Sequence, residues 1–94
     1  MKVILIYDIE TIEPCDQKRL NKVRKIARKY LYHVQKSVFE GDLTEGQLYK
    51  LEKAILEVVD KDKDSVIIYK LPDTVKWERI ILARKNFDFD SNLL

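Results

Sequence analysis

The chain has 94 residues, of which 46% are hydrophobic and only two are glycine and two proline, which excludes a disordered chain and indicates one globular domain. Charged residues make up 36% of the chain, and the net charge of only +2 does not by itself indicate a polyanionic partner. Because the chain has a single cysteine and no apolar run of membrane-spanning length, we expect a cytoplasmic protein with no internal disulfide and no membrane partner.

The first predicted element is a strand over residues 2–8, an apolar run rich in β-branched side chains that ends at Asp8. Successive side chains of a strand point to opposite faces, and here both sets are apolar. Both faces of this strand therefore need cover.

Residues 16–30 predict a helix with Asp16 as its N-cap after Pro14. Apolar residues recur at helical spacing and mark its buried stripe: Leu20, Val23, Ala27 and Tyr30. Between residues 16 and 29 there are seven basic residues and one acid, while the rest of the chain is acidic on balance. Four lysines fall in one line on the opposite side of the helix, namely Lys18, Lys22, Lys25 and Lys29, and we call this line the basic ridge. Arg19, Arg24 and Arg28 flank the ridge.

Residues 31–43 have strand character and form either one kinked strand or two short strands in a tight hairpin. Gly41 offers a bend or a bulge in this stretch. Residues 44–59 then predict a second helix, which a capping box of Thr44 and Gln47 opens.

The last third of the chain predicts a strand over residues 65–71, again apolar on both faces, and a further strand over residues 75–83. We expect a single domain over residues 1–94, with a core over 1–83 and a tail or edge strand over 84–94.

This order of elements predicts an α+β fold with a ferredoxin-like antiparallel sheet and both helices on one face. That plan leaves the other face of the sheet bare, although two of its strands are apolar there. A second copy of the chain is the simplest cover, so we expect a homodimer with two-fold symmetry.

Most familiar catalytic patterns are missing, since the sequence has one histidine, one cysteine and no glycine-rich loop or zinc-ligand spacing. Asp8 is the best-placed carboxylate, because the end of a buried strand holds a side chain rigidly. It could also simply cap the chain after the strand. Near the axis of a dimer, however, two copies of Asp8 would repel each other unless a cation such as Mg²⁺ lay between them. Water activated by that ion could attack a phosphodiester while the basic ridge held the phosphate backbone.

Two motifs make the chain resemble the CRISPR-associated protein two family. The first strand ends in Tyr7, Asp8 and Ile9 (YDI), and a VQxSVFEGxLT block follows over residues 34–44. The DSVIIY strand over residues 64–69 also fits, so the resemblance covers the first 70 to 80 residues.

This resemblance implies a ferredoxin-like homodimer whose C-terminal strand extends the partner's sheet and which acts with the CRISPR integrase subunit in spacer acquisition. It implies a magnesium-dependent endonuclease acting on single-stranded RNA or double-stranded DNA, with Asp8 as the metal-binding and catalytic residue. It also implies that the nucleic acid contacts Lys18, Arg19, Lys22, Lys25, Arg28, Lys29 and Phe39.

Three other functions stay open at this point. The chain could be a non-catalytic subunit that holds DNA in the integrase complex, or a toxin-type ribonuclease of the same fold. It could also be a regulatory module that binds a small ligand, although the basic ridge argues against that function.

Overall fold

The computed structural model describes residues 1–84, and the predicted tail lies outside the described residues from residue 85 onward. Six elements follow one another in the predicted order: β1 (Lys2–Asp8), α1 (Pro14–Tyr30), β2 (Tyr32–Gln35), β3 (Val38–Asp42), α2 (Glu45–Leu56) and β4 (Ser65–Leu71). The stretch over residues 31–43 is therefore a hairpin of two short strands.

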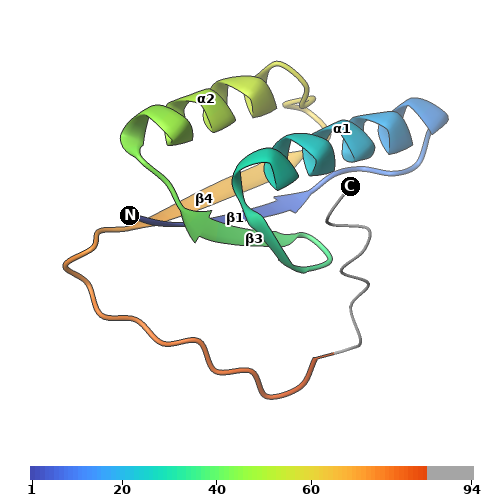
Figure 1. The fold of residues 1–94 in the computed structure, drawn as a ribbon. Helices are drawn as coiled ribbons and strands as arrows, with labels where there is room; N and C mark the ends of the chain where they lie inside the picture. The colour runs from blue at the N-terminus through green and yellow to red at the C-terminus, as the bar shows by residue number, and fades with distance from the viewer. Residues whose placement is uncertain (85–94) are drawn as a thin grey trace.

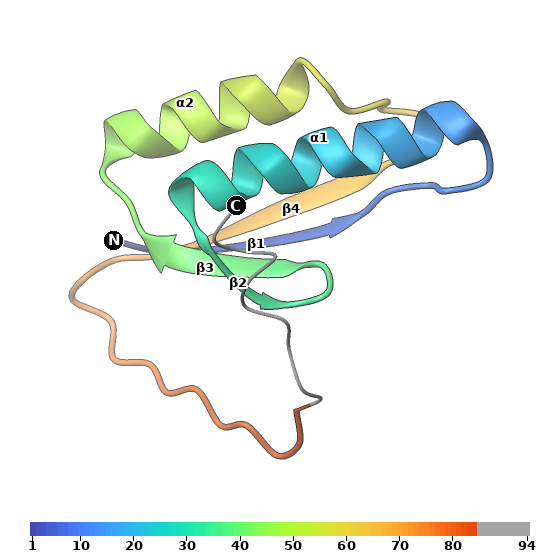
Figure 2. The same ribbon diagram turned by 45° about the vertical axis from the view of Figure 1, so that its right-hand side comes forward.

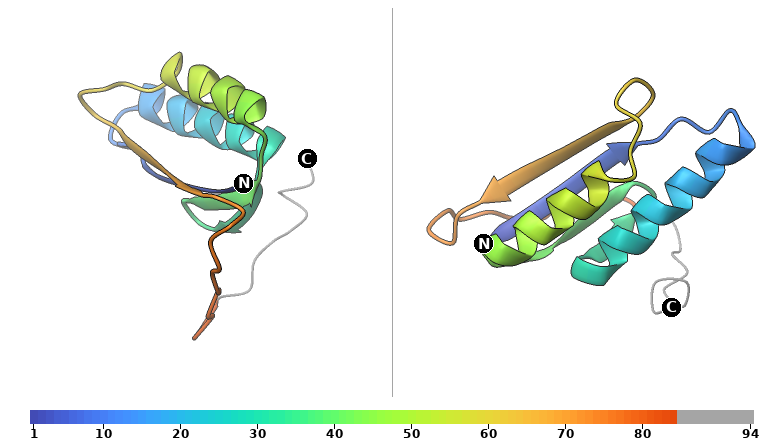
Figure 3. Two further views of the ribbon diagram at one scale, coloured as in Figure 1. Left: turned by 90° about the vertical axis from the view of Figure 1, so that its left-hand side faces the viewer. Right: turned by 90° about the horizontal axis from the view of Figure 1, so that it is seen from above.

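The strands form one antiparallel sheet in the order β2-β3-β1-β4, with β1 between β3 and β4. Both helices lie on the same face of this sheet, so the protein has two layers (Figures 1 and 3). Figure 2 shows α1 and α2 side by side above the strands. This architecture confirms the predicted ferredoxin-like α+β fold.

The core lies between the helices and the sheet, where burial of apolar surface drives folding. From β1 it receives Val3, Leu5 and Tyr7, which are at most 4% exposed. From α1 the core receives Val23 and Ala27 of the predicted stripe, and from α2 it receives Leu48, Leu51 and Ile55. The capping box of α2 is also present, since Gln47 N donates to Thr44 Oγ1 at 3.2 Å and Thr44 N donates to Gln47 Oε1 at 2.9 Å.

The prediction that Asp16 caps α1 is wrong, because the helix begins two residues earlier. Pro14 takes the first helical position and Glu13 is the N-cap. A proline suits that position, since its fixed φ is helical and its missing N–H would have no partner there. Asp16 is instead the third helical residue, and its carboxylate accepts from Glu13 N at 2.8 Å.

Gly41 lies in regular pairing with Val3, and the irregularity of the hairpin lies between His33 and Gln35. The predicted bend at Gly41 is therefore absent. A Cβ at residue 41 would come within 3.1 Å of the Leu31 side chain, so the glycine serves the close approach of Leu31 to β3.

The predicted strand over residues 75–83 is also absent, because these described residues have no regular secondary structure. The chain turns away from the sheet after β4, at Pro72–Thr74, and runs along the face that carries no helix (Figure 1). A β-strand needs a neighbouring strand to pair with, and this segment pairs with none within residues 1–84. It is tied to the sheet by an ion pair of Arg79 with Glu40 and by Lys2 Nζ, which lies 4.2 Å from the centre of the Trp77 ring.

Candidate metal and nucleic-acid sites

Asp8 is the last residue of β1, the strand with a neighbour on each side, and its side chain is exposed. Alternation along β1 places it on the same face as Ile4 and Ile6, opposite to the helices. Its carboxylate makes no hydrogen bond or ion pair with any of residues 1–84. A carboxylate held this way is available to a ligand.

One copy of the chain offers a metal ion little else at this position. Within residues 1–84, no three acidic, histidine or cysteine side chains come together. The single carboxylate of Asp8 fits Mg²⁺, because this ion binds one or two carboxylates and keeps several waters. It does not fit a structural zinc site, which needs four protein ligands.

A buried ion-pair cluster holds the loop that follows Asp8 and the turn that precedes β4, and sequence analysis missed it. Asp64, whose side chain is 1% exposed, accepts from Arg19 Nε at 2.6 Å and from Arg19 Nη2 at 2.9 Å. It also accepts from the main-chain N–H groups of Glu10, at 3.2 Å, and of Asp60, at 2.8 Å. Asp64 therefore joins the loop after β1 to α1 and to the residue before β4.

Asp16 completes the cluster from the first turn of α1. Its fully buried carboxylate accepts from Arg19 Nη1 at 2.8 Å and from the main-chain N–H groups of Glu13 and Ile12 at 2.8 and 3.1 Å. The N–H of Glu13, and then the Arg19 guanidinium, lower the pKa of Asp16 to about 2. The hydrogen bonds from Arg19 likewise lower the pKa of Asp64, so both carboxylates are charged at neutral pH. Only the three-residue spacing of Asp16 and Arg19 is a sequence signal for this cluster, because Asp64 is 45 residues away from Arg19.

The basic ridge of α1 is exposed along its whole length, as its pattern predicts. Its eleven-residue rise amounts to about 16 Å, which spans roughly five nucleotide steps along one strand of a duplex. The helices and Asp8 lie on opposite faces of the sheet. The structure therefore does not bring the ridge and Asp8 together into one pocket of a single copy.

Three residues that we expected to contact nucleic acid do not lie on the exposed basic ridge. Phe39 is fully buried within one copy and stacks on His33 with ring centres 4.1 Å apart, so it is not part of the exposed surface that carries the ridge. It is buried because its side chain lies on the helix-covered face of β3, opposite Leu5. Arg19 is bound within the Asp16–Asp64 cluster and is not part of the exposed surface. Arg28 is half-buried, and within residues 1–84 its Nε has no hydrogen-bond partner.

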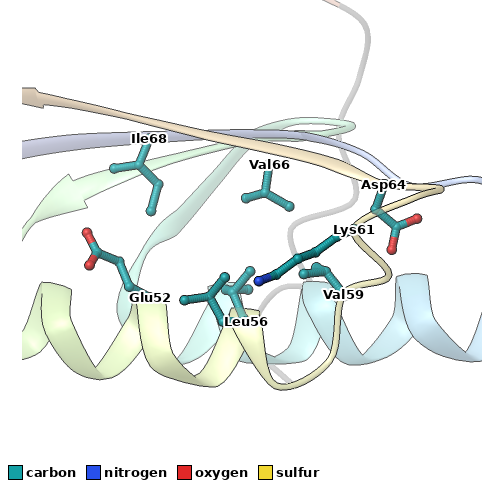
Figure 4. Close-up of a pocket in the computed structure, with 8 residues that line it drawn as sticks. Glu52, Leu56, Val59, Lys61, Asp64, Val66 and Ile68 are labelled. Carbon is teal, nitrogen blue, oxygen red and sulfur yellow. The ribbon is translucent and has the colours of Figure 1, made fainter.

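A groove of about 380 Å³ runs between α2 and β4, at the open edge of the sheet. Val66 and Ile68 line it from the strand and Leu56 lines it from the helix, while Lys61 and Asp64 lie toward one end (Figure 4). Its mostly apolar lining is not what a phosphate backbone requires. No helix within residues 1–84 is both long enough and apolar enough to cross a bilayer.

Comparison with known proteins gives one consistent family. The sequence pattern described as "CRISPR associated protein Cas2" matches residues 1–79. The chain is 58% identical to the "CRISPR-associated endoribonuclease Cas2 2" of Moorella thermoacetica over 81 residues, which cover 86% of this chain and 89% of that one. It is 38% identical over 90 residues to the "CRISPR-associated endoribonuclease Cas2" of Methanocaldococcus jannaschii, covering 96% of this chain and 74% of that one. The crystal structure of Streptococcus pyogenes Cas2 at pH 6.5 matches the fold with a TM-score of 0.71 and 32% identity, covering 79% of this chain and 89% of that one.

Proposed function

The chain belongs to the CRISPR-associated Cas2 family, and on that premise we propose that it is a homodimeric, magnesium-dependent endonuclease of CRISPR adaptation. In this proposal Asp8 binds the metal ion and is the catalytic residue, and the substrate is single-stranded RNA or double-stranded DNA. The name endoribonuclease, which the relatives carry, favours RNA as the first substrate to test.

The state of Asp8 is the observation that carries this proposal. Among residues 1–84 the exposed Asp8 carboxylate has no partner, and at the end of the central strand β1 it can bind a cation in a fixed direction. It also lies on the uncovered face of the sheet, where a second copy of the chain would bring a second Asp8. Two carboxylates then meet the number of protein ligands that Mg²⁺ requires.

When bound, the ion supplies a Lewis acid that activates water and offsets the charge that develops on the phosphate. The contribution of the protein is to fix where that chemistry occurs. Asp8 would hold the ion by its carboxylate, and pairing with Ser65 of β4 holds the Asp8 main chain. Asp64 holds the following loop through Glu10 N, so the site does not depend on a flexible segment.

The uncovered face of the sheet supports the homodimer. Ile67 and Tyr69 of β4 are 48% and 53% exposed on this face, next to the half-buried Ile4 and Ile6. Within residues 1–84 the outer edge of β4 also has no strand partner. Residues 75–83 carry apolar side chains at Val75, Trp77 and 80–83 and pair with no strand of residues 1–84, so we propose that they pair with the β4 edge of the other copy.

Sedimentation velocity tests the dimer. We expect the wild-type chain to sediment as a dimer at micromolar concentration and Ile67→Lys to shift it toward the monomer, because a charge would be buried in the interface. Ile12→Lys is the matched control, since Ile12 is 78% exposed in the β1–α1 loop and lies off this face. A wild-type chain that stays monomeric at this concentration contradicts the proposal.

Cleavage assays with defined RNA and DNA oligonucleotides test the site. We expect Asp8→Ala to lower magnesium-dependent cleavage at least about a hundredfold, because the ion contributes several kcal/mol to the transition state. Asp42→Asn is the control, since Asp42 is also an exposed aspartate at a strand end but lies at the opposite end of β1. Equal cleavage by wild type and Asp8→Ala would mean that the activity does not come from this site.

A second function is favoured by the separation of the basic ridge from Asp8. A ridge on the helical face can hold a nucleic acid without presenting it to the carboxylate. The chain would then act as a subunit that holds DNA for the CRISPR integrase subunit, with or without cleavage of its own. Tight DNA binding by a wild-type chain that cleaves neither RNA nor DNA in the presence of Mg²⁺ would support this function over the nuclease.

A further inference from the structure

Ser65 is the residue that faces Asp8 across the sheet. It opens β4, and the register pairs it directly with Asp8. Residues paired in this way point to the same face, with Cβ atoms about 4.5–5.5 Å apart. Both side chains are exposed, and no hydrogen bond joins them.

The other side of Asp8 has no equivalent neighbour. The pairing of β1 with β3 ends at Ile6 and Val38, and one more hydrogen bond joins Tyr7 N to the carbonyl of Ser37 at 3.2 Å. Within residues 1–84, Ser65 is therefore the only cross-strand neighbour of Asp8.

The position of Ser65 is fixed by the residue before it. Asp64 accepts hydrogen bonds from Arg19 on α1, from Asp60 in the preceding turn and from Glu10 in the loop after Asp8. The same buried carboxylate thus holds the main chain next to Ser65 and the main chain two residues beyond Asp8. The distance between the two exposed side chains is set by the pairing of β1 with β4 and by this cluster, and not by a contact of their own.

The two side chains differ in the hydrogen bonds they can make. An ionised carboxylate only accepts, whereas a serine hydroxyl donates one hydrogen bond and accepts two. A gap of about 5 Å between Cβ atoms leaves room for one water or one phosphate oxygen between the two groups. Ser65 can donate to a phosphate oxygen there, which Asp8 cannot do.

We propose that Ser65 is a positioning residue of the Asp8 site, whose hydroxyl bonds to the water or phosphate oxygen brought there by the ion that Asp8 binds. This inference rests on the proposed magnesium site. Residues around a metal site that orient its ligands commonly change metal affinity or activity by about ten- to a hundredfold when they are removed.

Mn²⁺ is the probe for the test, because its binding to the full-length dimer can be measured by electron paramagnetic resonance without any turnover. We expect Ser65→Ala to raise the Kd for Mn²⁺ and to lower kcat for oligonucleotide cleavage, each by about tenfold, with KM changed less. Ser65→Thr keeps the hydroxyl and suits a strand, so it should retain most of both. Thr11→Ala, which removes an exposed hydroxyl from the loop after β1, is the control and should match the wild type.

The outcomes separate this inference from the proposed function. If Asp8→Ala loses Mn²⁺ binding while Ser65→Ala keeps the wild-type Kd and kcat, the role of Ser65 is wrong and the metal site stands. If Asp8→Ala binds Mn²⁺ as the wild type does, or the wild type binds none, both are overturned. If Ser65→Ala and Ser65→Thr lose binding equally and both lower Tm, Ser65 acts through the fold alone and the inference is refuted.

Discussion

Removal of the Asp64 carboxylate should destabilise the protein more than any other single change at a charged residue of the turn before β4. Asp64→Ala leaves Arg19 with Asp16 as its only partner and removes the acceptor of Glu10 N and Asp60 N. Breaking a buried ion pair by removal of one partner costs about 3–5 kcal/mol. Because Asp16 still pairs with Arg19, we expect the lower end, about 3 kcal/mol, in the free energy of unfolding.

Urea denaturation followed by circular dichroism measures this change in the free energy of unfolding. In a thermal melt of a domain of this size, a loss of about 3 kcal/mol lowers Tm by about 12–24 °C. All variants must be compared at one protein concentration, because a dimer gains stability from association. Asp62→Ala is the matched control, since Asp62 is an exposed aspartate of the same turn and should change the free energy by less than about 0.5 kcal/mol.

A loss of less than about 1 kcal/mol for Asp64→Ala would refute this reasoning. It would mean that the cost of burying the charges offsets their attraction, and that main-chain pairing of β1 with β4 fixes this end of the sheet without the cluster.

Two further predictions concern the charged groups. The pKa of Asp16 lies at about 2 rather than 3.8, so its contribution to stability is complete above about pH 4 and is lost as the pH falls toward 2. Thermal melts from pH 7 to pH 2 should therefore show a fall in Tm below pH 4 that is shallower in Asp16→Asn, and parallel curves would contradict this assignment. Replacement of the four lysines of the basic ridge by glutamine should weaken the salt dependence of duplex DNA binding, measured by fluorescence anisotropy. The slope of log K against log salt concentration should become shallower by up to about 3.6 per copy. Replacement of Lys50 and Lys53 on α2 by glutamine is the control and should leave this slope unchanged. An unchanged slope would show that the ridge binds no phosphate.

The sequence predicts correctly those elements whose formation depends on residues close to one another in the chain. The capping box of Thr44 and Gln47 and the apolar run that ends at Asp8 depend on a few neighbouring residues, and the structure confirms both. It also confirms Val23 and Ala27 of the α1 stripe as buried. The start of α1 was misplaced because Pro14 and Asp16 are both good helix-start residues. In the structure Pro14 is the first helical residue, so the helix begins before Asp16.

The burial of Phe39 and Arg19 and the error over residues 75–83 share a different cause, which is that the contacts that decide them are distant in sequence. Phe39 is buried because β3 pairs with β1, which places its side chain beside Leu5 under the helices. Arg19 leaves the exposed surface because Asp64 lies opposite to it in the fold. Residues 75–83 have the pattern of a strand, but a strand forms only where another strand offers its edge.

The placement of Asp8 and the basic ridge on opposite faces limits how one copy can act on a nucleic acid. A duplex bound along the ridge lies on the helical layer, whereas Asp8 opens on the face that a second copy would cover. In the proposed dimer, a strand cleaved at Asp8 would have to reach the edge of the interface, while the ridge held a different part of the nucleic acid. Cleavage and binding should then respond to different substitutions. Asp8→Ala should lower kcat and leave the Kd for DNA unchanged. Substitutions in the ridge should raise the Kd for DNA and leave kcat at saturating substrate unchanged. If ridge variants lost kcat at saturation as strongly as Asp8→Ala, the ridge would have to position the scissile phosphate, and the two surfaces would form one site in the dimer.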